Sequence, residues 1–157
     1  MGDSGKEKKV MENTTLYIAY GSNLNLEQMA HRCPTAKVAG ASKLMGYQLR
    51  FRGGRHGSVA TVEKKRGGSV PILVWEITPA DEAELDRYEG WPHLYRKETV
   101  RVRLNGKLVS AMIYIMNEGR PLGAPSPYYY NIIAQGYKDA GFDSNFFKQA
   151  VRDSVIE

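Results

Sequence analysis

The chain has 157 residues, long enough for one domain with a buried core. Its 42% hydrophobic and 25% charged residues are ordinary for a soluble globular protein. No apolar stretch approaches the roughly 18 residues of a membrane span, and the polar start lacks the apolar segment of a secretory signal. We therefore expect no membrane partner. A single cysteine, Cys33, excludes an internal disulfide and fits a cytoplasmic protein.

The charge pattern is typical of a solvated surface. The formal net charge is +5, from 22 basic and 17 acidic residues, and part of the excess stands in short clusters. One cluster, Lys64–Arg66, is expected in a turn before Gly67-Gly68. Nucleic-acid binding requires basic residues gathered on one face, so we expect no nucleic-acid partner. Residues 1–14 predict a flexible N-terminal tail, and residues 15–157 predict a single domain.

Several segments carry the signals of β-strands. Val100 and Val102 alternate with Arg101 and Arg103, the pattern of a half-buried strand. The dipeptide Asn105-Gly106 follows, and both residue types tolerate positive φ, which predicts a tight type I′ hairpin. The predicted strands are Leu16–Tyr20, Ala41–Arg52, Gly57–Glu63, Val70–Ile77, Thr99–Leu104 and Leu108–Met116.

Helices are fewer and are marked by their first residues. Thr78-Pro79 and Ser126-Pro127 each combine a capping residue with proline at the first helical position. The predicted helices cover Leu26–Arg32, Pro79 to about Tyr88, Pro127–Ala140, and Ser144 to about Asp153. Together the elements predict an α+β fold: a small, mostly antiparallel β-barrel with flanking helices.

The first strand stops in Gly21-Ser22-Asn23, just before a capped helix. Glycine allows the backbone to approach a ligand closely, and the first N–H groups of a helix have no partner within it. Such a concavity can hold an anion or the oxyanion of a reacting carbonyl. An ordinary strand–helix turn has the same composition, so this segment alone leaves both interpretations open.

Glu89 stands where the helix from Pro79 is expected to end. A carboxylate at that position meets the negative end of the helix dipole, where lysine or arginine is preferred. Tyr88 and Trp91 flank it and would partly desolvate it. Both effects favour the neutral acid and would raise its pKa toward the range of a general base. The alternative is an exposed glutamate on a fraying helix end.

These segments together resemble the γ-glutamylcyclotransferase family, which includes γ-glutamylamine cyclotransferase-like proteins. The resemblance extends from about Leu16 to Phe142 and keeps the family's order. It is carried by Tyr20-Gly21-Ser22-Asn23-Leu24, Ala60-Thr61-Val62 after Gly57, Val74-Trp75, Tyr88-Glu89-Gly90 with Tyr95, Tyr114, and Pro125-Ser126-Pro127 with Tyr129.

The resemblance implies an enzyme that releases 5-oxoproline from small-molecule γ-glutamyl amides, without a cofactor. In this family the substrate's α-amine attacks its own γ-carbonyl, and the family's catalytic glutamate corresponds to Glu89. The substrate-binding segment corresponds to Tyr20, Gly21, Ser22, Asn23 and Leu24, whose amides would hold the oxyanion and the α-carboxylate. The aromatic residues that would line the pocket are Tyr95, Tyr114 and Tyr129.

Two other functions stay open from the sequence. The chain could be a non-catalytic module that binds a small molecule or a partner on the same fold. The less favoured alternative is a protein that binds nucleic acid or an acidic partner through its basic strands. The histidines are far apart and none has a second ligand at a recognised metal spacing, so no metal is expected. We expect a monomer or homodimer.

Overall fold

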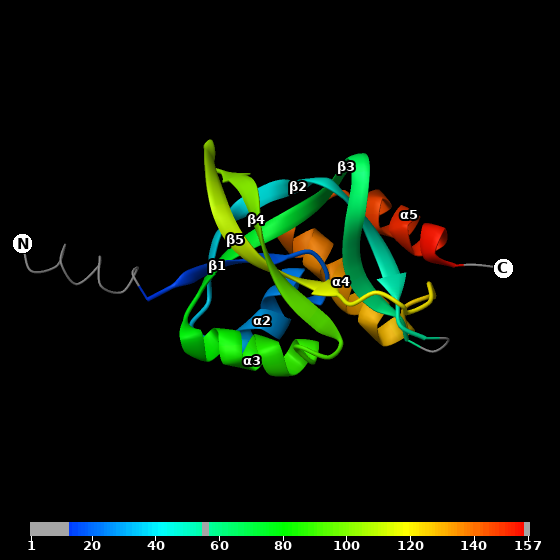
Figure 1. The fold of residues 1–157 in the computed structure, drawn as a ribbon, viewed down its shortest axis with the longest axis horizontal. Helices are drawn as coiled ribbons and strands as arrows, with labels where there is room; N and C mark the ends of the chain where they lie inside the picture. Colours follow the sequence, from blue (N-terminus) through cyan, green and yellow to red (C-terminus); the bar gives the residue numbers. More distant parts are fainter. Residues whose placement is uncertain (1–12, 55–56, 156–157) are drawn as a thin grey trace, which may run out of the picture.

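The computed structural model describes residues 13–54 and 57–155, so most of the expected N-terminal tail lies outside the described residues. Five strands form one mixed sheet, which helices flank (Figure 1). In chain order the elements are β1 Thr15–Ala19, η1 Ser22–Leu24, α2 Leu26–Arg32, β2 Lys37–Arg52, β3 Val59–Ile77, α3 Pro79–Glu89, β4 Tyr95–Leu104, β5 Lys107–Met116, α4 Pro127–Ala140 and α5 Ser144–Ser154.

The sheet is open, so the α+β prediction is confirmed but the predicted barrel is wrong. The strand order is β2-β3-β1-β5-β4, with β1 and β5 parallel at Tyr17 and Met112 and the other pairs antiparallel. Within the described residues no backbone ladder joins the edge strands β2 and β4. The Ser42 hydroxyl instead donates to the carbonyl of Arg103. Side-chain contact thus takes the place of the ladder that would close a barrel.

Two predicted strands form the single strand β3, and the turn expected at Lys64–Arg66 is wrong. Met45 of β2 pairs with Ser69, but Tyr47 pairs with Lys64. Residues 65–68 therefore lie opposite Gly46 alone, as a bulge. Gly67, at φ +77°, adopts a conformation that side chains rarely tolerate. The two glycines predicted to reverse the chain instead let the strand bend and continue.

Local signals at element ends predicted the structure well. Thr78 and Asp81 form a reciprocal capping box at the start of α3, and Gly90 ends that helix in the left-handed conformation. Asn105 and Gly106 both have positive φ, which confirms the predicted hairpin between β4 and β5. These features depend on residues that are neighbours in the chain, so a short stretch of sequence is enough to identify them.

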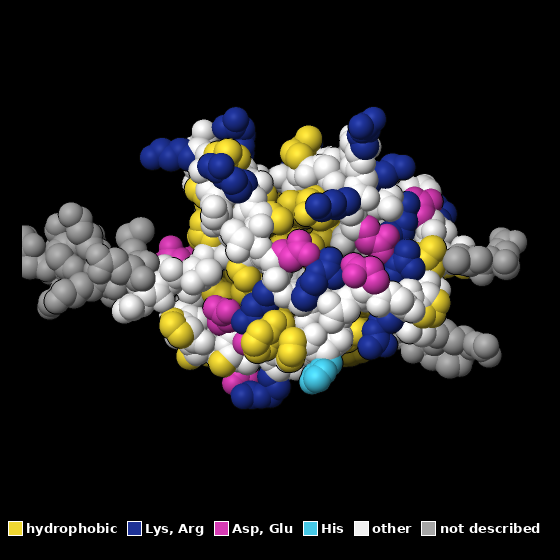
Figure 2. Space-filling model, viewed as in Figure 1, with side chains coloured by type: hydrophobic (Ala, Val, Ile, Leu, Met, Phe, Trp, Pro, Cys, Tyr) yellow, Lys and Arg dark blue, Asp and Glu magenta, His cyan; other side chains and the backbone are white. Residues whose placement is uncertain are grey.

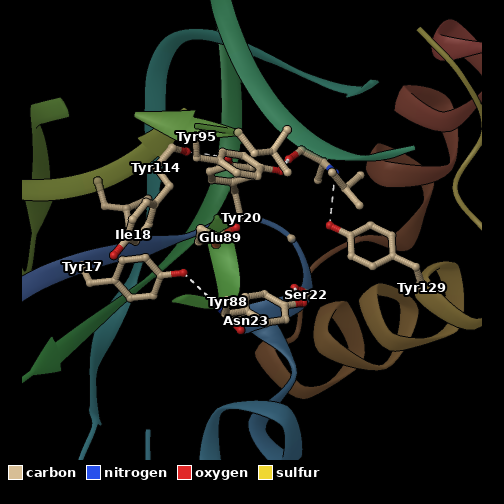
Figure 3. Close-up of a pocket in the computed structure, with 14 residues that line it drawn as sticks. Tyr17, Ile18, Tyr20, Ser22, Asn23, Tyr88, Glu89, Tyr95, Tyr114 and Tyr129 are labelled. Atoms are coloured by element: carbon tan, nitrogen blue, oxygen red, sulfur yellow. Dashed lines mark hydrogen bonds between the residues drawn. The ribbon is translucent and has the colours of Figure 1, made fainter. Parts of the chain in front are cut away.

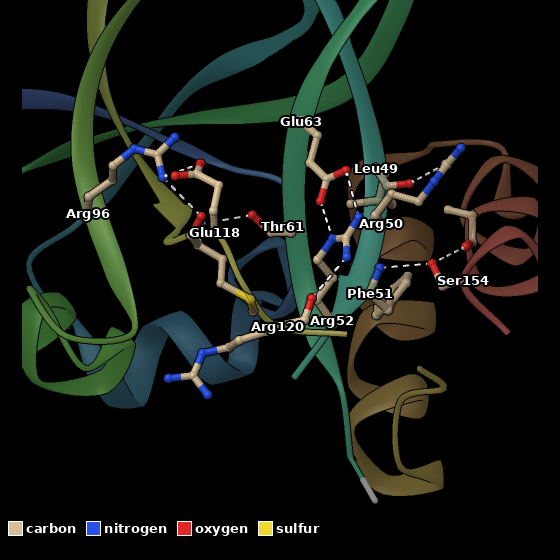
Figure 4. A network of polar contacts seen from close by, with 12 residues as sticks. Leu49, Arg50, Phe51, Arg52, Thr61, Glu63, Arg96, Glu118, Arg120 and Ser154 are labelled. Carbon is tan, nitrogen blue, oxygen red and sulfur yellow. Dashed lines mark hydrogen bonds and ion pairs between the residues drawn. The ribbon is translucent and has the colours of Figure 1, made fainter. Parts of the chain in front are cut away.

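Basic side chains of the sheet lie beside acidic ones. Figure 2 shows Lys and Arg along the upper edge of one face and Asp and Glu among them across its middle. Arg52 is paired with Glu63, and Arg96 lies 2.6 Å from Glu98 and 3.1 Å from Glu118 (Figure 4). The cations predicted along β2 and β4 are thus partly compensated. No helix in the described part of the chain is both long and apolar enough to cross a membrane.

Helix α4 packs directly on the η1 segment. At Gly136 a Cβ atom would lie 2.8 Å from the backbone nitrogen of Asn25 and 2.8 Å from the Cβ of Leu24. The Asn25 side chain also donates to the carbonyl of Ile132 in α4. This close approach fixes the position of the chain just after β1.

We expect Gly136→Ala to lower the free energy of unfolding by about 1–3 kcal/mol, because the added methyl group forces α4 away from η1. Helix propensity alone predicts the opposite, a gain of about 1 kcal/mol. Chemical denaturation measures the difference. Lys138→Ala, on the exposed side of the same helix, should change stability by less than about 0.5 kcal/mol. A Gly136→Ala protein as stable as the wild type would contradict this account of the packing.

Candidate active site

A cavity of about 220 Å³ opens where β1 ends and α3 stops (Figure 3). Strands, helices and the η1 segment all contribute to its wall, so residues far apart in the sequence meet there. The lining residues are Tyr17, Ile18, Tyr20, Gly21, Ser22, Asn23, Val59, Ala60, Tyr88, Glu89, Leu94, Tyr95, Tyr114 and Tyr129.

The η1 segment presents backbone amides at one wall of this cavity. A Cβ atom at Gly21 would lie 3.0 Å from the Cβ of Ala60 and 3.4 Å from the Tyr129 hydroxyl, so glycine permits the close approach. Among the described residues, no acceptor binds the N–H groups of Gly21, Ser22 or Asn23. These amides can donate to a bound anion or oxyanion.

Leu24 departs from the expectation for this segment. Its N–H donates to the carbonyl of Gly21 at 3.0 Å, which closes the short 3₁₀ turn. Its side chain is fully buried in the core, and it does not line the cavity. The sequence motif therefore extends one residue beyond the free amides, because a 3₁₀ turn uses the N–H three residues after its first carbonyl.

Asn23 anchors the segment with its side chain and its carbonyl. Its amide nitrogen donates to the Tyr17 hydroxyl at 2.8 Å, and its side-chain oxygen accepts from Arg32. The indole N–H of Trp75 donates to the Asn23 carbonyl at 3.2 Å. These contacts position the segment, and within the described part of the chain the backbone N–H of Asn23 stays free for a ligand.

Glu89 is the last residue of α3, and its half-buried side chain faces the cavity. No hydrogen bond or ion pair joins its carboxylate to another described residue. Burial raises the pKa of Glu89 to about 8, and the Arg32 guanidinium partly opposes this rise in pKa. An unpaired carboxyl group that titrates near neutral pH can both accept and return a proton.

The tyrosines of the wall are held by their own hydroxyl groups. Tyr20 donates to the carbonyl of Tyr114 at 2.6 Å, and Tyr114 donates to Asp86 at 2.6 Å. Tyr129 accepts from the N–H of Ala60 at 3.1 Å. The Tyr95 hydroxyl donates to the carbonyl of the same residue, Ala60. The rings thus shape the cavity while their hydrogen bonds go to the protein.

The structure brings the predicted Tyr20, Tyr95, Tyr114 and Tyr129 into one wall with Glu89. It also adds residues that the sequence analysis did not select, above all Tyr17 and Tyr88. In the sequence, Tyr88 belongs to the Tyr88-Glu89-Gly90 motif and is expected to desolvate the glutamate. Its hydroxyl lies 2.8 Å from the Ser22 hydroxyl and so links α3 to η1. Tyr17 gave no sequence signal, because its role depends on Asn23 folding back onto β1.

Trp91 and His93 lie outside the cavity wall. Trp91 is exposed, and the Lys97 ammonium lies 4.2 Å from the centre of its ring. His93 is exposed, and its carbonyl accepts from the Asn117 side chain. Desolvation of Glu89 therefore comes from the cavity wall and not from Trp91. The described residues contain no group of three His, Cys, Asp or Glu side chains arranged to hold a metal ion.

Comparison with known proteins identifies the family. Residues 17–135 match the model of the family described as γ-glutamyl cyclotransferase, AIG2-like. The chain belongs to this family. It is 33% identical to the γ-glutamylcyclotransferase of Homo sapiens, over 83% of this chain and 73% of the relative, and 30% identical to that of Mus musculus, over 92% and 79%. The family resemblance read from the sequence is confirmed.

Solved structures agree with this assignment. A structure described as γ-glutamyl cyclotransferase superposes with a TM-score of 0.75 at 30% sequence identity, over 87% of this chain and 86% of that chain. The fold that positions Glu89 and the η1 segment is therefore the fold of the family.

The raised pKa of Glu89 predicts how stability depends on pH. The folded protein holds this proton up to about pH 8, whereas a free glutamate loses it near pH 4.5. Stability is therefore lost as pH rises between these values. Glu89→Gln removes that loss, so its unfolding free energy should exceed that of the wild type by a margin that grows by up to about 1.4 kcal/mol per pH unit.

Denaturation at a series of pH values measures this margin, which should be constant above pH 8. Glu84→Gln is the matched control, since Glu84 lies on the same helix with its side chain half exposed. Its curve should run parallel to that of the wild type. If the curve of Glu89→Gln also ran parallel to that of the wild type, the pKa of Glu89 would not be raised in the folded protein.

Proposed function

We propose that the protein releases 5-oxoproline from γ-glutamyl amides of small molecules, with Glu89 as the proton shuttle. Membership of the γ-glutamyl cyclotransferase family supports the reaction type. The observation that carries the residue assignment is the pairing of an unpartnered carboxyl group with a row of free amides in one small cavity. One group can move protons, and the other can stabilise a developing negative charge.

The reaction needs no nucleophile from the protein. The substrate's α-amine attacks its own γ-carbonyl, so the cavity must bend the γ-glutamyl chain until the two atoms meet. Holding reactants in attack geometry can supply about 7–11 kcal/mol of the barrier. A cavity of about 220 Å³ walled by hydrogen-bonded tyrosine rings is suited to enforcing such a bent shape.

Glu89 moves one proton through the reaction. Its carboxylate takes the proton from the attacking amine as the new C–N bond closes the ring. The same carboxyl group then gives the proton to the leaving nitrogen, whose bond to the γ-carbon breaks, so 5-oxoproline and an amine leave the site. Each assisted proton transfer typically contributes about 10²–10⁴-fold. A pKa of about 8 suits both directions near neutral pH.

The amides of Gly21, Ser22 and Asn23 act on the other end of the substrate. They would donate to the oxygen of the tetrahedral intermediate and to the substrate's α-carboxylate. In comparable sites the loss of one donor costs about 3–4 kcal/mol of transition-state stabilisation. The leaving group stays open within this proposal: an amino acid, an ε-lysyl amine or another amine.

The direct test is release of 5-oxoproline from a panel of γ-glutamyl amino acids and γ-glutamyl amines. The wild type should turn over at least one member, and Glu89→Gln should lower kcat by about 10²-fold or more, because it can neither accept nor return the proton. Binding of the substrate to Glu89→Gln, measured by calorimetry, should persist.

Glu84→Gln should retain wild-type turnover, because Glu84 lies on the outer surface of α3, paired with Arg87. A Glu89→Gln protein that kept most of its rate would remove Glu89 from its role. Substrate binding without turnover by the wild type, across the whole panel, would favour the non-catalytic binding module.

A further inference from the structure

Arg32, the last residue of α2, contacts two walls of the cavity at once. One guanidinium nitrogen donates to the side-chain oxygen of Asn23, and the other donates to Gln28 at 3.0 Å. The flat face of the group lies over the Tyr88 ring, with its central carbon 3.4 Å from the ring centre. Stacking and a fork of donors are what arginine provides and lysine does not.

These contacts form a closed circuit. Arg32 holds Asn23 and the Tyr88 ring, and the Tyr88 hydroxyl returns to Ser22 at 2.8 Å. Ser22 and Asn23 are consecutive residues of η1, whereas Tyr88 directly precedes Glu89 in α3. The circuit therefore joins the free amides to the helix end that carries the carboxyl group.

The charge of Arg32 is not neutralised by a fixed partner. Among the described residues, no carboxylate lies within ion-pair distance of its guanidinium, which is held by two neutral amide oxygens and a ring. A direct ion pair between Arg32 and Glu89 would occupy the carboxylate oxygens. It would also lower the pKa of Glu89 too far for a general base. A nearby cation held apart favours the ionised form while leaving both oxygens free for substrate.

The other groups that face Glu89 are neutral or already paired. Burial raises the pKa of the surrounding phenols, so they stay protonated in the working range; these are Tyr17, Tyr20, Tyr95, Tyr114 and Tyr129. The Tyr88 hydroxyl is bonded to Ser22. Asp86, which accepts from Tyr114, lies 2.8 Å from Lys97.

We propose that Arg32 is a positioning residue that clamps η1 to the end of α3 and places an uncompensated positive charge near Glu89 without touching the substrate. The inference rests on the proposed function for its role in catalysis. The clamp sets the distance between carboxyl group and amides, and the charge keeps Glu89 available as a base. No substrate contact is required of Arg32.

The pH dependence of kcat/KM separates this role from a merely structural one. In Arg32→Gln the midpoint of the rise with pH should move upward by about one pH unit, because the cation is gone. Arg32→Lys keeps the charge, so its midpoint should stay near that of the wild type. Both should reach a plateau about tenfold or more below the wild type, because the stacked clamp is lost.

Arg87→Gln is the matched control. It removes the same charge two residues before Glu89, from a side chain that is exposed and paired with Glu84. It should leave the midpoint and the plateau unchanged, and the substrate's own amine contributes equally in every variant. An Arg32→Gln midpoint equal to that of Arg87→Gln would overturn the proposal. An Arg32→Lys protein with the same kcat/KM plateau as the wild type would also overturn it. This second comparison tests the proposal even if Arg32→Gln does not fold.

A second readout does not depend on turnover. The difference in unfolding free energy between Glu89→Gln and its parent, followed against pH, reports the titration of Glu89 alone. In an Arg32→Gln background the pH at which this difference levels off should rise by about one pH unit. If the wild type turned over no γ-glutamyl amide, the proposed function would fail while this measurement still tested the clamp. If the difference levelled off at the same pH as in the Arg32 protein, the effect of Arg32 on Glu89 would be overturned.

Discussion

Close backbone contact around the η1 segment is the constraint on which the rest of the site depends. Gly21 passes so near Ala60 of β3 that a Cβ atom would lie 3.0 Å from the neighbouring methyl group. On its other side, Gly136 of α4 lets that helix rest on Leu24. Trp75 then binds the Asn23 carbonyl. Fixed from these directions, the segment cannot turn its free amides back into the protein.

The second determinant is how the hydrogen bonds of the cavity wall are assigned. Tyr20, Tyr95 and Tyr114 donate their hydroxyl protons to protein oxygens, and the Tyr129 hydroxyl accepts from a backbone N–H. The wall is rich in hydroxyl groups, yet none of those in the described residues donates to Glu89. Desolvation is therefore not compensated, and this is the physical reason that burial raises the pKa of the carboxyl group.

An intramolecular reaction explains why so few protein groups are needed. In the proposed reaction the substrate brings both nucleophile and electrophile, so the protein has to supply shape, one mobile proton and a place for negative charge. The cavity, Glu89 and the amides of η1 correspond to these three requirements. Arg32 links the latter two mechanically, because it contacts Asn23 on one side and Tyr88 on the other.

Local chemistry explains which parts of the fold were predictable. The capping box of Thr78 and Asp81 and the positive φ of Asn105 and Gly106 depend on residues next to one another. Strand pairing depends on distant partners. The two strands predicted for β3 form one strand with a bulge opposite Gly46. The edge strands β2 and β4 do not pair, so the sheet is open where a barrel was predicted. Neither feature has a signal within a short window of sequence.

The same division holds for the site. The sequence by itself indicated the family and selected Glu89 and the segment from Tyr20 to Leu24. Both lie at a helix end, and helix-end preferences depend on neighbouring residues. Only the tertiary structure decided that the Leu24 side chain is buried in the core and that Tyr17 and Tyr88 belong to the wall. The solvation of a carboxyl group depends on every element packed around it, and these elements meet only when the chain has folded.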